Sequence, residues 1–308
     1  MNLSHFLIAT ALIGLALSIF FLYAQSFFRR EGSFMRRVIP FEPRTPVPWN
    51  GLEVFLFFIA WILLVSVSAD VCEHLQFGSQ IQERTLEPEQ IAELQKGHAL
   101  VQFIACGRDD PRVFLVVFLA AVIIIPIGEE FLFRLLLQGW LEKLEGSLRK
   151  VLRLFRGLFA VLCSSVIFAA IHWRSTTEVR PFQELFDGFL AMTLGWTAMI
   201  VVVTAYLLFV RSATLRDLGI DHRKIFGDCL LGLGAVCFLA PPIYLLNGGL
   251  LLLYGDTNYT LDPIPLFFFA VGLGVLYYRT RRILPCIVLH GVFNGISVGG
   301  AYLSAYTF

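Results

Sequence analysis

Long apolar stretches constrain this chain more than any other feature of its sequence. A membrane-spanning helix needs about 20 mostly apolar residues, and soluble domains are only about 45–50% apolar. This chain is 57% hydrophobic, and its mean hydropathy is +0.74. We therefore predict an all-α fold, a polytopic transmembrane helical bundle of about eight spans with a polar site in the membrane interior. The predicted spans are residues 5–28, 50–70, 112–128, 157–173, 188–210, 228–254, 263–278 and 283–303.

The distribution of basic residues predicts how these spans are oriented. Of the 24 Lys and Arg residues, 17 lie in the first, third, fifth and seventh loops, whereas six lie in the even-numbered loops. Cytoplasmic loops carry the excess of basic residues in membrane proteins. We therefore expect an integral, multi-pass protein of the cell (inner) membrane with both termini on the extracytoplasmic side. The first apolar stretch has no Lys or Arg before it, so we interpret it as a retained helix rather than a signal peptide.

The predicted spans and loops divide the chain into three parts. Residues 1–70 hold two transmembrane helices joined by a basic cytoplasmic loop, and residues 71–111 form an acidic extracytoplasmic loop. Residues 112–308 form the transmembrane core, with two inserted spans at about 188–254. The net charge of +1 gives no reason to expect a nucleic-acid partner. The six cysteines form no CxxC pair, which argues against a structural zinc site.

The first group of polar residues that interrupts the apolar pattern contains Glu129, Glu130 and Arg134. Ionisable groups within spans are costly to bury, so they usually face a cavity and serve a function. Glu130 and Arg134 are four residues apart on one helical face and can pair, whereas Glu129 points about 100° away around the helix. Pro126 would loosen the helix and free a backbone carbonyl. The alternative is a charged cluster at the membrane edge.

The second and third groups each contain a histidine. His172 ends the fourth predicted span beside Trp173, and by itself it would be read as an interfacial anchor. His290 and Asn294 are four residues apart, so they share a helical face; a packing hydrogen bond is the alternative to a catalytic role. Four glycines of the same span would let a neighbouring backbone approach closely: Gly291, Gly295, Gly299 and Gly300.

The combined chemistry of these groups indicates hydrolysis. A carboxylate in a low-dielectric pocket can act as a general base on water, and a histidine can share that role or protonate the leaving amine. Histidine and asparagine donors can stabilise an oxyanion. No Ser/His/Asp set is evident, and no HExxH motif offers zinc ligands. The sequence therefore favours peptide-bond hydrolysis at a glutamate- and histidine-based site.

The three groups resemble the motifs of the CAAX protease and bacteriocin-processing (CPBP) family of intramembrane glutamic-type endopeptidases, also called the Abi family. The family patterns EExxxR, FxxxH and HxxxN (or HxxxD) occur here in family order as Glu129-Glu130-xxx-Arg134, Phe168-xxx-His172 and His290-xxx-Asn294. The resemblance covers about residues 113–175 and 263–300. It implies a fold of membrane helices and a substrate that is a membrane-associated peptide or protein.

The resemblance also implies a role for each motif residue. Glu129 would activate the water with help from His172, and His290 and Asn294 would form the oxyanion site. Glu130 and Arg134 would support Glu129, with Phe168 as the remaining motif residue. No metal or other cofactor is implied.

Two other functions compete with this interpretation. Glu129, His172 and His290 could be ligands of a zinc-dependent membrane metalloprotease, since two histidines and a glutamate suit zinc, although no two of them are local neighbours. A non-catalytic membrane scaffold or transporter could retain the fold with buried protonatable groups.

Overall fold

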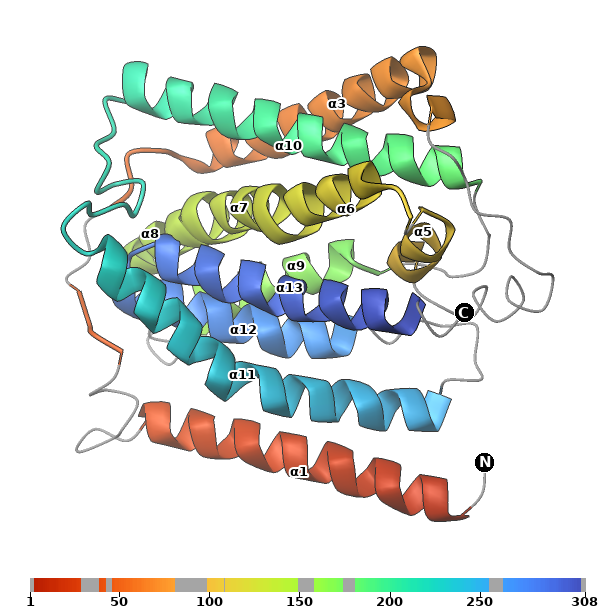
Figure 1. Ribbon diagram of the computed structural model, residues 1–308. Coiled ribbons are helices and arrows are strands. Elements are labelled where there is room, and N and C mark those ends of the chain that lie inside the picture. Colours follow the sequence, from red (N-terminus) through yellow and green to blue (C-terminus); the bar gives the residue numbers. More distant parts are fainter. Residues whose placement is uncertain are drawn as a thin grey trace. The chain divides into compact units, whose positions relative to one another are not determined.

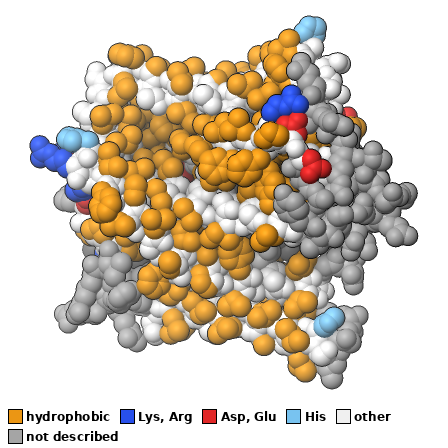
Figure 2. Space-filling view, in the orientation of Figure 1, with side chains coloured by type: hydrophobic (Ala, Val, Ile, Leu, Met, Phe, Trp, Pro, Cys, Tyr) orange, Lys and Arg blue, Asp and Glu red, His pale blue; other side chains and the backbone are white. Residues whose placement is uncertain are grey.

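The computed structural model describes residues 3–28, 39–42, 46–80, 99–107, 109–148, 158–173, 181–254 and 263–305 (Figure 1). Helices dominate these residues, and no strand occurs among them. Seven helices are long and apolar enough to cross a membrane. Apolar side chains cover much of the face shown in Figure 2. Leu63, Val201 and Leu251 are among the large apolar side chains that are exposed. The predicted all-α polytopic bundle is confirmed.

Seven of the eight predicted spans correspond to helices of span length within the described residues. The eighth, residues 157–173, corresponds to α9 (Leu158–Ile171), whose described part is an apolar helix of 14 residues.

The third predicted span is much longer than residues 112–128. A continuous helix of 37 residues covers Pro111–Ser147. Asp110 caps its N-terminus by accepting a hydrogen bond from the Arg112 amide, and Pro111 occupies the first helical position, where its missing N–H does no harm. The prediction ended this span at its charged residues. That boundary is wrong because those side chains are buried within the helix rather than placed at its end.

Two π-helical segments interrupt this long helix. Its consecutive parts are α6 (Pro111–Val117), η2 (Phe118–Ile124), α7 (Ile125–Glu129), η3 (Glu130–Gln138) and α8 (Gly139–Ser147). Segments η2 and η3 are π-helical. Such segments are rare and frequently occur at functional sites.

The chain divides into two compact units that alternate along the sequence. The first unit consists of Met1–Pro48, Phe133–Thr176 and Thr214–Leu289. The second unit consists of Trp49–Leu132, Thr177–Ala213 and His290–Phe308.

In the second unit, α10 (Phe182–Phe209) packs along α3 (Gly51–Leu75) and also contacts α5 (Ala99–Gly107), α6, η2, α7 and the short 3-10 helix η1 (Phe77–Gln80). The Asn50 side chain accepts a hydrogen bond from the Glu53 backbone amide, and the Glu53 carboxylate accepts one from the Asn50 backbone amide. These two reciprocal bonds form a capping box on α3. The same carboxylate accepts hydrogen bonds from Arg211 and Tyr206, so it ties α3 to the end of α10.

In the first unit, α1 (Leu3–Phe28) lies along α11 (Ile225–Tyr254), and α12 (Pro263–Thr280) contacts both α11 and α9 (Figure 1). A glycine allows the first pair to pack closely, because a Cβ on Gly249 would lie 3.0 Å from the Ala9 carbonyl oxygen. The Phe20 and Phe268 rings stack with centroids 4.5 Å apart. The last span, α13 (Leu284–Ala305), contributes residues to both units.

Candidate active site

The second unit brings three of the predicted site residues into direct contact. Glu129 ends α7, Glu130 begins η3, and His290 lies on α13. The Nδ1 atom of His290 is 2.8 Å from Oε1 of Glu130, and its Nε2 atom is 3.6 Å from Oε2 of Glu129. All three residues are buried, with exposed fractions of 7%, 0% and 3% in sequence order. One imidazole ring therefore lies between two buried carboxyl groups.

The two contacts of the His290 ring differ in kind. The 2.8 Å separation of Nδ1 from Glu130 Oε1 is a hydrogen bond. The 3.6 Å separation of Nε2 from Glu129 Oε2 is longer than a hydrogen bond, so the second ring nitrogen lies beside Glu129 without a direct bond to it. General acid–base catalysis needs a proton donor and acceptor within direct reach or one water molecule apart.

Asn294 donates a hydrogen bond to a backbone carbonyl that Pro126 leaves without an amide partner. The Ile125 amide bonds to the Ala120 carbonyl, five residues back. In that register the Ala121 carbonyl would accept from residue 126, but proline has no N–H. The Asn294 side-chain amide donates to the Ala121 carbonyl at 2.8 Å instead. The expectation that Pro126 frees a backbone carbonyl is thus confirmed, and one amide proton of Asn294 is already engaged.

Two glycines bring neighbouring elements close to the carboxyl pair. A Cβ on Gly291 would lie 2.7 Å from the Val122 carbonyl oxygen, and a Cβ on Gly128 would overlap the indole of Trp196. The predicted close approach is confirmed at Gly291, whereas no atom of the described residues lies within 4 Å of a Cβ on Gly299. Gly295 makes an ordinary contact and Gly300 faces open space. Only the first of the four predicted glycines therefore requires a missing side chain.

The first unit brings together the other three predicted residues. Phe168 is buried on α9, and the Arg134 guanidinium lies 5.5 Å from the centroid of its ring. The half-buried His172 ring packs on Phe168 with centroids 4.5 Å apart. His172 Nδ1 is 2.7 Å from the Phe168 carbonyl oxygen, so Nδ1 carries the hydrogen and Nε2 is the acceptor nitrogen. In a neutral ring, Nε2 is then the nitrogen that can accept a proton.

A buried polar network beneath Arg134 was not predicted. Arg134 Nη1 donates to the Ser164 hydroxyl at 3.2 Å, and that hydroxyl lies 3.4 Å from Gln138 Oε1. Gln138 donates to Glu142 at 3.0 Å and to the Gly274 carbonyl at 2.9 Å. The Arg281 guanidinium forms an ion pair with the Glu142 carboxylate at 3.2 Å and is the last member of the network.

A sequence signal for this network exists. Polar residues occur at every fourth position from Glu130 through Arg134 and Gln138 to Glu142, and residues four apart share a helical face. All four are buried. Reading this spacing past the EExxxR motif would have identified Gln138 and Glu142.

The predicted site residues thus form two groups. Glu129, Glu130, His290 and Asn294 belong to the second unit, whereas Arg134, Phe168 and His172 belong to the first. The predicted pairing of Glu130 with Arg134 and the predicted cooperation of Glu129 with His172 stay predictions. Among the described residues, no three His, Cys, Asp or Glu side chains gather as a group that could hold a metal ion.

A comparison with models of protein families found a match. The model of a family described as type II CAAX prenyl endopeptidase Rce1-like matches residues 111–296. The match begins at the first residue of the long helix and ends two residues after Asn294, so it contains every predicted site residue. No curated protein and no solved structure matches the chain.

Proposed function

Because the chain belongs to the Rce1-like family of type II CAAX prenyl endopeptidases and is a membrane protease, we propose that it cleaves peptide bonds with a water molecule activated by Glu129. The protein is an integral multi-pass membrane protein, and its substrate lies in or at a bilayer. The observation that carries the proposed chemistry is the contact of one buried imidazole, His290, with both Glu129 and Glu130.

The proposed first step is the attack of water on the scissile carbonyl. Glu129 takes a proton from the water as the new C–O bond forms, and negative charge develops on the carbonyl oxygen. His172, whose acceptor nitrogen is Nε2, assists in moving this proton. When the C–N bond breaks, the same proton passes to the leaving amine. A positioned base of this kind contributes roughly 10²–10⁴-fold to the rate.

The oxyanion would be stabilised by His290 and Asn294. A charged His290 has a donor on Nε2, and Asn294 keeps a second amide proton beyond the one that it gives to Ala121. Donors aimed at a developing oxyanion act strongly in a low-dielectric site, where removal of one costs roughly 10²–10³-fold in kcat.

Glu130 and Arg134 would act as positioning residues. Glu130 accepts from Nδ1 of His290 and so directs Nε2 toward Glu129. Arg134 is held by the Ser164 hydroxyl and lies over the Phe168 ring. We propose that Gln138 and Ser164 fix the guanidinium so that it supports Glu130 one helical turn earlier. The chemistry uses no metal or organic cofactor.

The proposed substrate is a prenylated C-terminal peptide of a membrane-associated protein, as the family description indicates. We also propose that the protein resides in the cell membrane with its basic loops on the cytoplasmic side. A residue introduced for labelling into the loop between α10 and α11 should then be accessible to the label only from the cytoplasmic side of intact cells.

A cleavage assay with purified full-length protein tests the function. A fluorogenic prenylated peptide should be cleaved by the wild type and by Glu184→Gln, which makes the same chemical change at an exposed site. Glu129→Gln and His290→Ala should reduce kcat at least about 100-fold. Cleavage at the wild-type rate by either variant would refute the proposal. Loss of wild-type activity with a chelator, restored by zinc, would instead support a metalloprotease.

A further inference from the structure

The loop that joins α10 to α11 has a defined conformation at one end of the spans. Gly219 has φ +71°, and a Cβ there would lie 2.9 Å from the Ile283 amide nitrogen. The Ile283 amide donates to the Gly219 carbonyl at 3.0 Å. Ile283 belongs to the turn between α12 and α13, and α11 begins at Ile225. The loop is therefore held where three transmembrane helices of the first unit begin or end.

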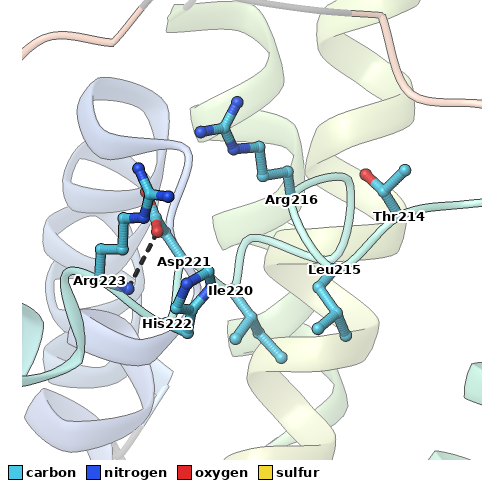
Figure 3. Close-up of a pocket in the computed structure, with 7 residues that line it drawn as sticks. All are labelled: Thr214, Leu215, Arg216, Ile220, Asp221, His222 and Arg223. Atoms are coloured by element: carbon cyan, nitrogen blue, oxygen red, sulfur yellow. Dashed lines mark hydrogen bonds between the residues drawn. The ribbon is translucent and has the colours of Figure 1, made fainter.

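A basic pocket of about 420 Å³ lies on this loop. Arg216, His222 and Arg223 supply its cationic or protonatable lining. Figure 3 shows the guanidinium groups of Arg216 and Arg223 pointing to the same side of the loop. Both side chains are exposed, and neither forms an ion pair with any described residue. By contrast, Lys224 pairs with Glu42 in the same unit.

The acidic residues of the loop are engaged by the loop itself. The Asp217 carboxylate accepts from the amide and the hydroxyl of Thr214, at 2.8 and 2.7 Å. The Asp221 carboxylate accepts from the Arg223 amide at 3.1 Å, which lowers its pKa, and it lies 3.9 Å from the Lys224 ammonium group. These carboxylates hold the turns in place, and two guanidinium groups remain available to an anion.

Apolar side chains occupy the opposite side of the same pocket. Leu215 and Ile220 line it, are 54% and 39% exposed, and point away from the two guanidinium groups in Figure 3. Phe226, in the first turn of α11, is 76% exposed. The pocket thus combines cationic groups on one side with exposed apolar side chains on the other.

We propose that this pocket binds the phosphate headgroup of an anionic phospholipid. Arg216 and Arg223 contact the phosphate oxygens, which the fork of a guanidinium matches well, and the acyl chains lie along Leu215 and Ile220. Basic pockets beside transmembrane helices recognise anionic headgroups in this way, each Lys or Arg contributing about fivefold in affinity. A free phosphate ion shares the headgroup chemistry, but it would gain nothing from the apolar side.

Lipid titration by native mass spectrometry tests this proposal on the detergent-purified full-length protein. Wild type should bind phosphatidylglycerol more tightly than phosphatidylcholine. R216Q/R223Q should weaken phosphatidylglycerol binding roughly 30-fold, which corresponds to about fivefold for each arginine. R112Q/K143Q removes two positive charges elsewhere and should change the affinity less than about twofold. A cooperative thermal unfolding transition would show that each variant is folded.

A third variant separates the two sources of phosphate. L215S/I220S should weaken phosphatidylglycerol binding while leaving the binding of inorganic phosphate unchanged. Equal binding of the two lipids by the wild type, or wild-type affinity in R216Q/R223Q, would overturn the proposal. So would wild-type phosphatidylglycerol affinity in L215S/I220S, which would indicate a simple phosphate site. None of these measurements involves proteolysis, so the result is independent of the proposed catalytic mechanism.

Discussion

His290 and Glu130 are 160 residues apart in the sequence, yet Nδ1 of the histidine lies 2.8 Å from Oε1 of the glutamate. The contact joins the last transmembrane helix to the π-helical segment that follows Glu129. It orients the imidazole so that its other nitrogen faces Glu129 at 3.6 Å. This arrangement separates the proposed duties of two adjacent carboxylates, since one forms a hydrogen bond that orients the histidine and the other lies beside its second nitrogen.

Glu130→Gln should therefore impair catalysis without abolishing substrate binding. The amide can still contact His290, but a neutral amide forms a weaker hydrogen bond with the imidazole than a carboxylate does. We expect kcat to fall roughly 10–100-fold with KM changed less than about threefold. Steady-state kinetics measure this. A change confined to KM would contradict the positioning role.

Gly291→Ala should destabilise the protein, whereas Gly299→Ala should not. Both glycines lie on α13, but only the first would drive a methyl group into the Val122 carbonyl, at 2.7 Å. Overpacking of this kind costs roughly 1–3 kcal/mol. Thermal unfolding in detergent micelles should show a lower midpoint for Gly291→Ala alone. Equal midpoints would mean that the two helices do not pack as described.

Asn294→Asp should weaken the same helix contact by a different route. An ionised carboxylate cannot donate to the Ala121 carbonyl and would repel it, which leaves an acceptor of the π-helical segment unsatisfied. We expect a loss of about 1–3 kcal/mol in unfolding free energy, with a similar loss in Asn294→Ala. Full stability in Asn294→Asp at pH 8 would show that this hydrogen bond is dispensable.

Gln138→Leu should destabilise the first unit and reduce activity together. The substitution removes the donor to Glu142 and to the Gly274 carbonyl and a neighbour of Ser164, all in the buried interior. Unsatisfied buried polar groups cost about 1–3 kcal/mol each. A double-mutant cycle with Ser164→Ala should give a coupling of about 0.5–3 kcal/mol in unfolding free energy. Additive effects would show that the two residues act independently.

The N-terminal cap of the long helix should be sensitive to pH. Hydrogen bonds from the Arg112 side chain hold the pKa of Asp110 below its usual value. A carboxyl group with a lowered pKa in the folded state contributes stability above its unfolded pKa of about 3.9, and this is lost as the pH falls through the folded value. Asp110→Ala should lower the unfolding temperature by roughly 1–2 °C at pH 7.

The difference between Asp110→Ala and wild type should shrink as the pH falls below about 3.9, and it should reach its minimum only below the lowered pKa of the folded-state carboxyl. Asp110→Asn is the matched control, because asparagine also caps helices but forms no ion pair. A difference between Asp110→Ala and wild type that persists unchanged in acid would show that the ionised form of Asp110 is unimportant.

The composition and spacing of the chain were sufficient to predict an all-α membrane protein and the residues of its three motifs. Apolar stretches of span length report directly on burial in lipid, and a charge within such a stretch is too costly to occur without a partner. The same reasoning placed the end of the third span wrongly at residue 128. The helix continues from Pro111 to Ser147, so Glu129 and Glu130 lie inside it.

What the sequence by itself determined is therefore which residues are polar within apolar helices and which of them share a helical face, because both properties depend only on local periodicity. The tertiary structure decided which of those side chains meet. The His290 ring forms a hydrogen bond with Glu130, and Asn294 donates to the carbonyl that Pro126 cannot satisfy. Such contacts depend on how distant helices pack, and the free energy of that packing is not encoded in the spacing of any single segment.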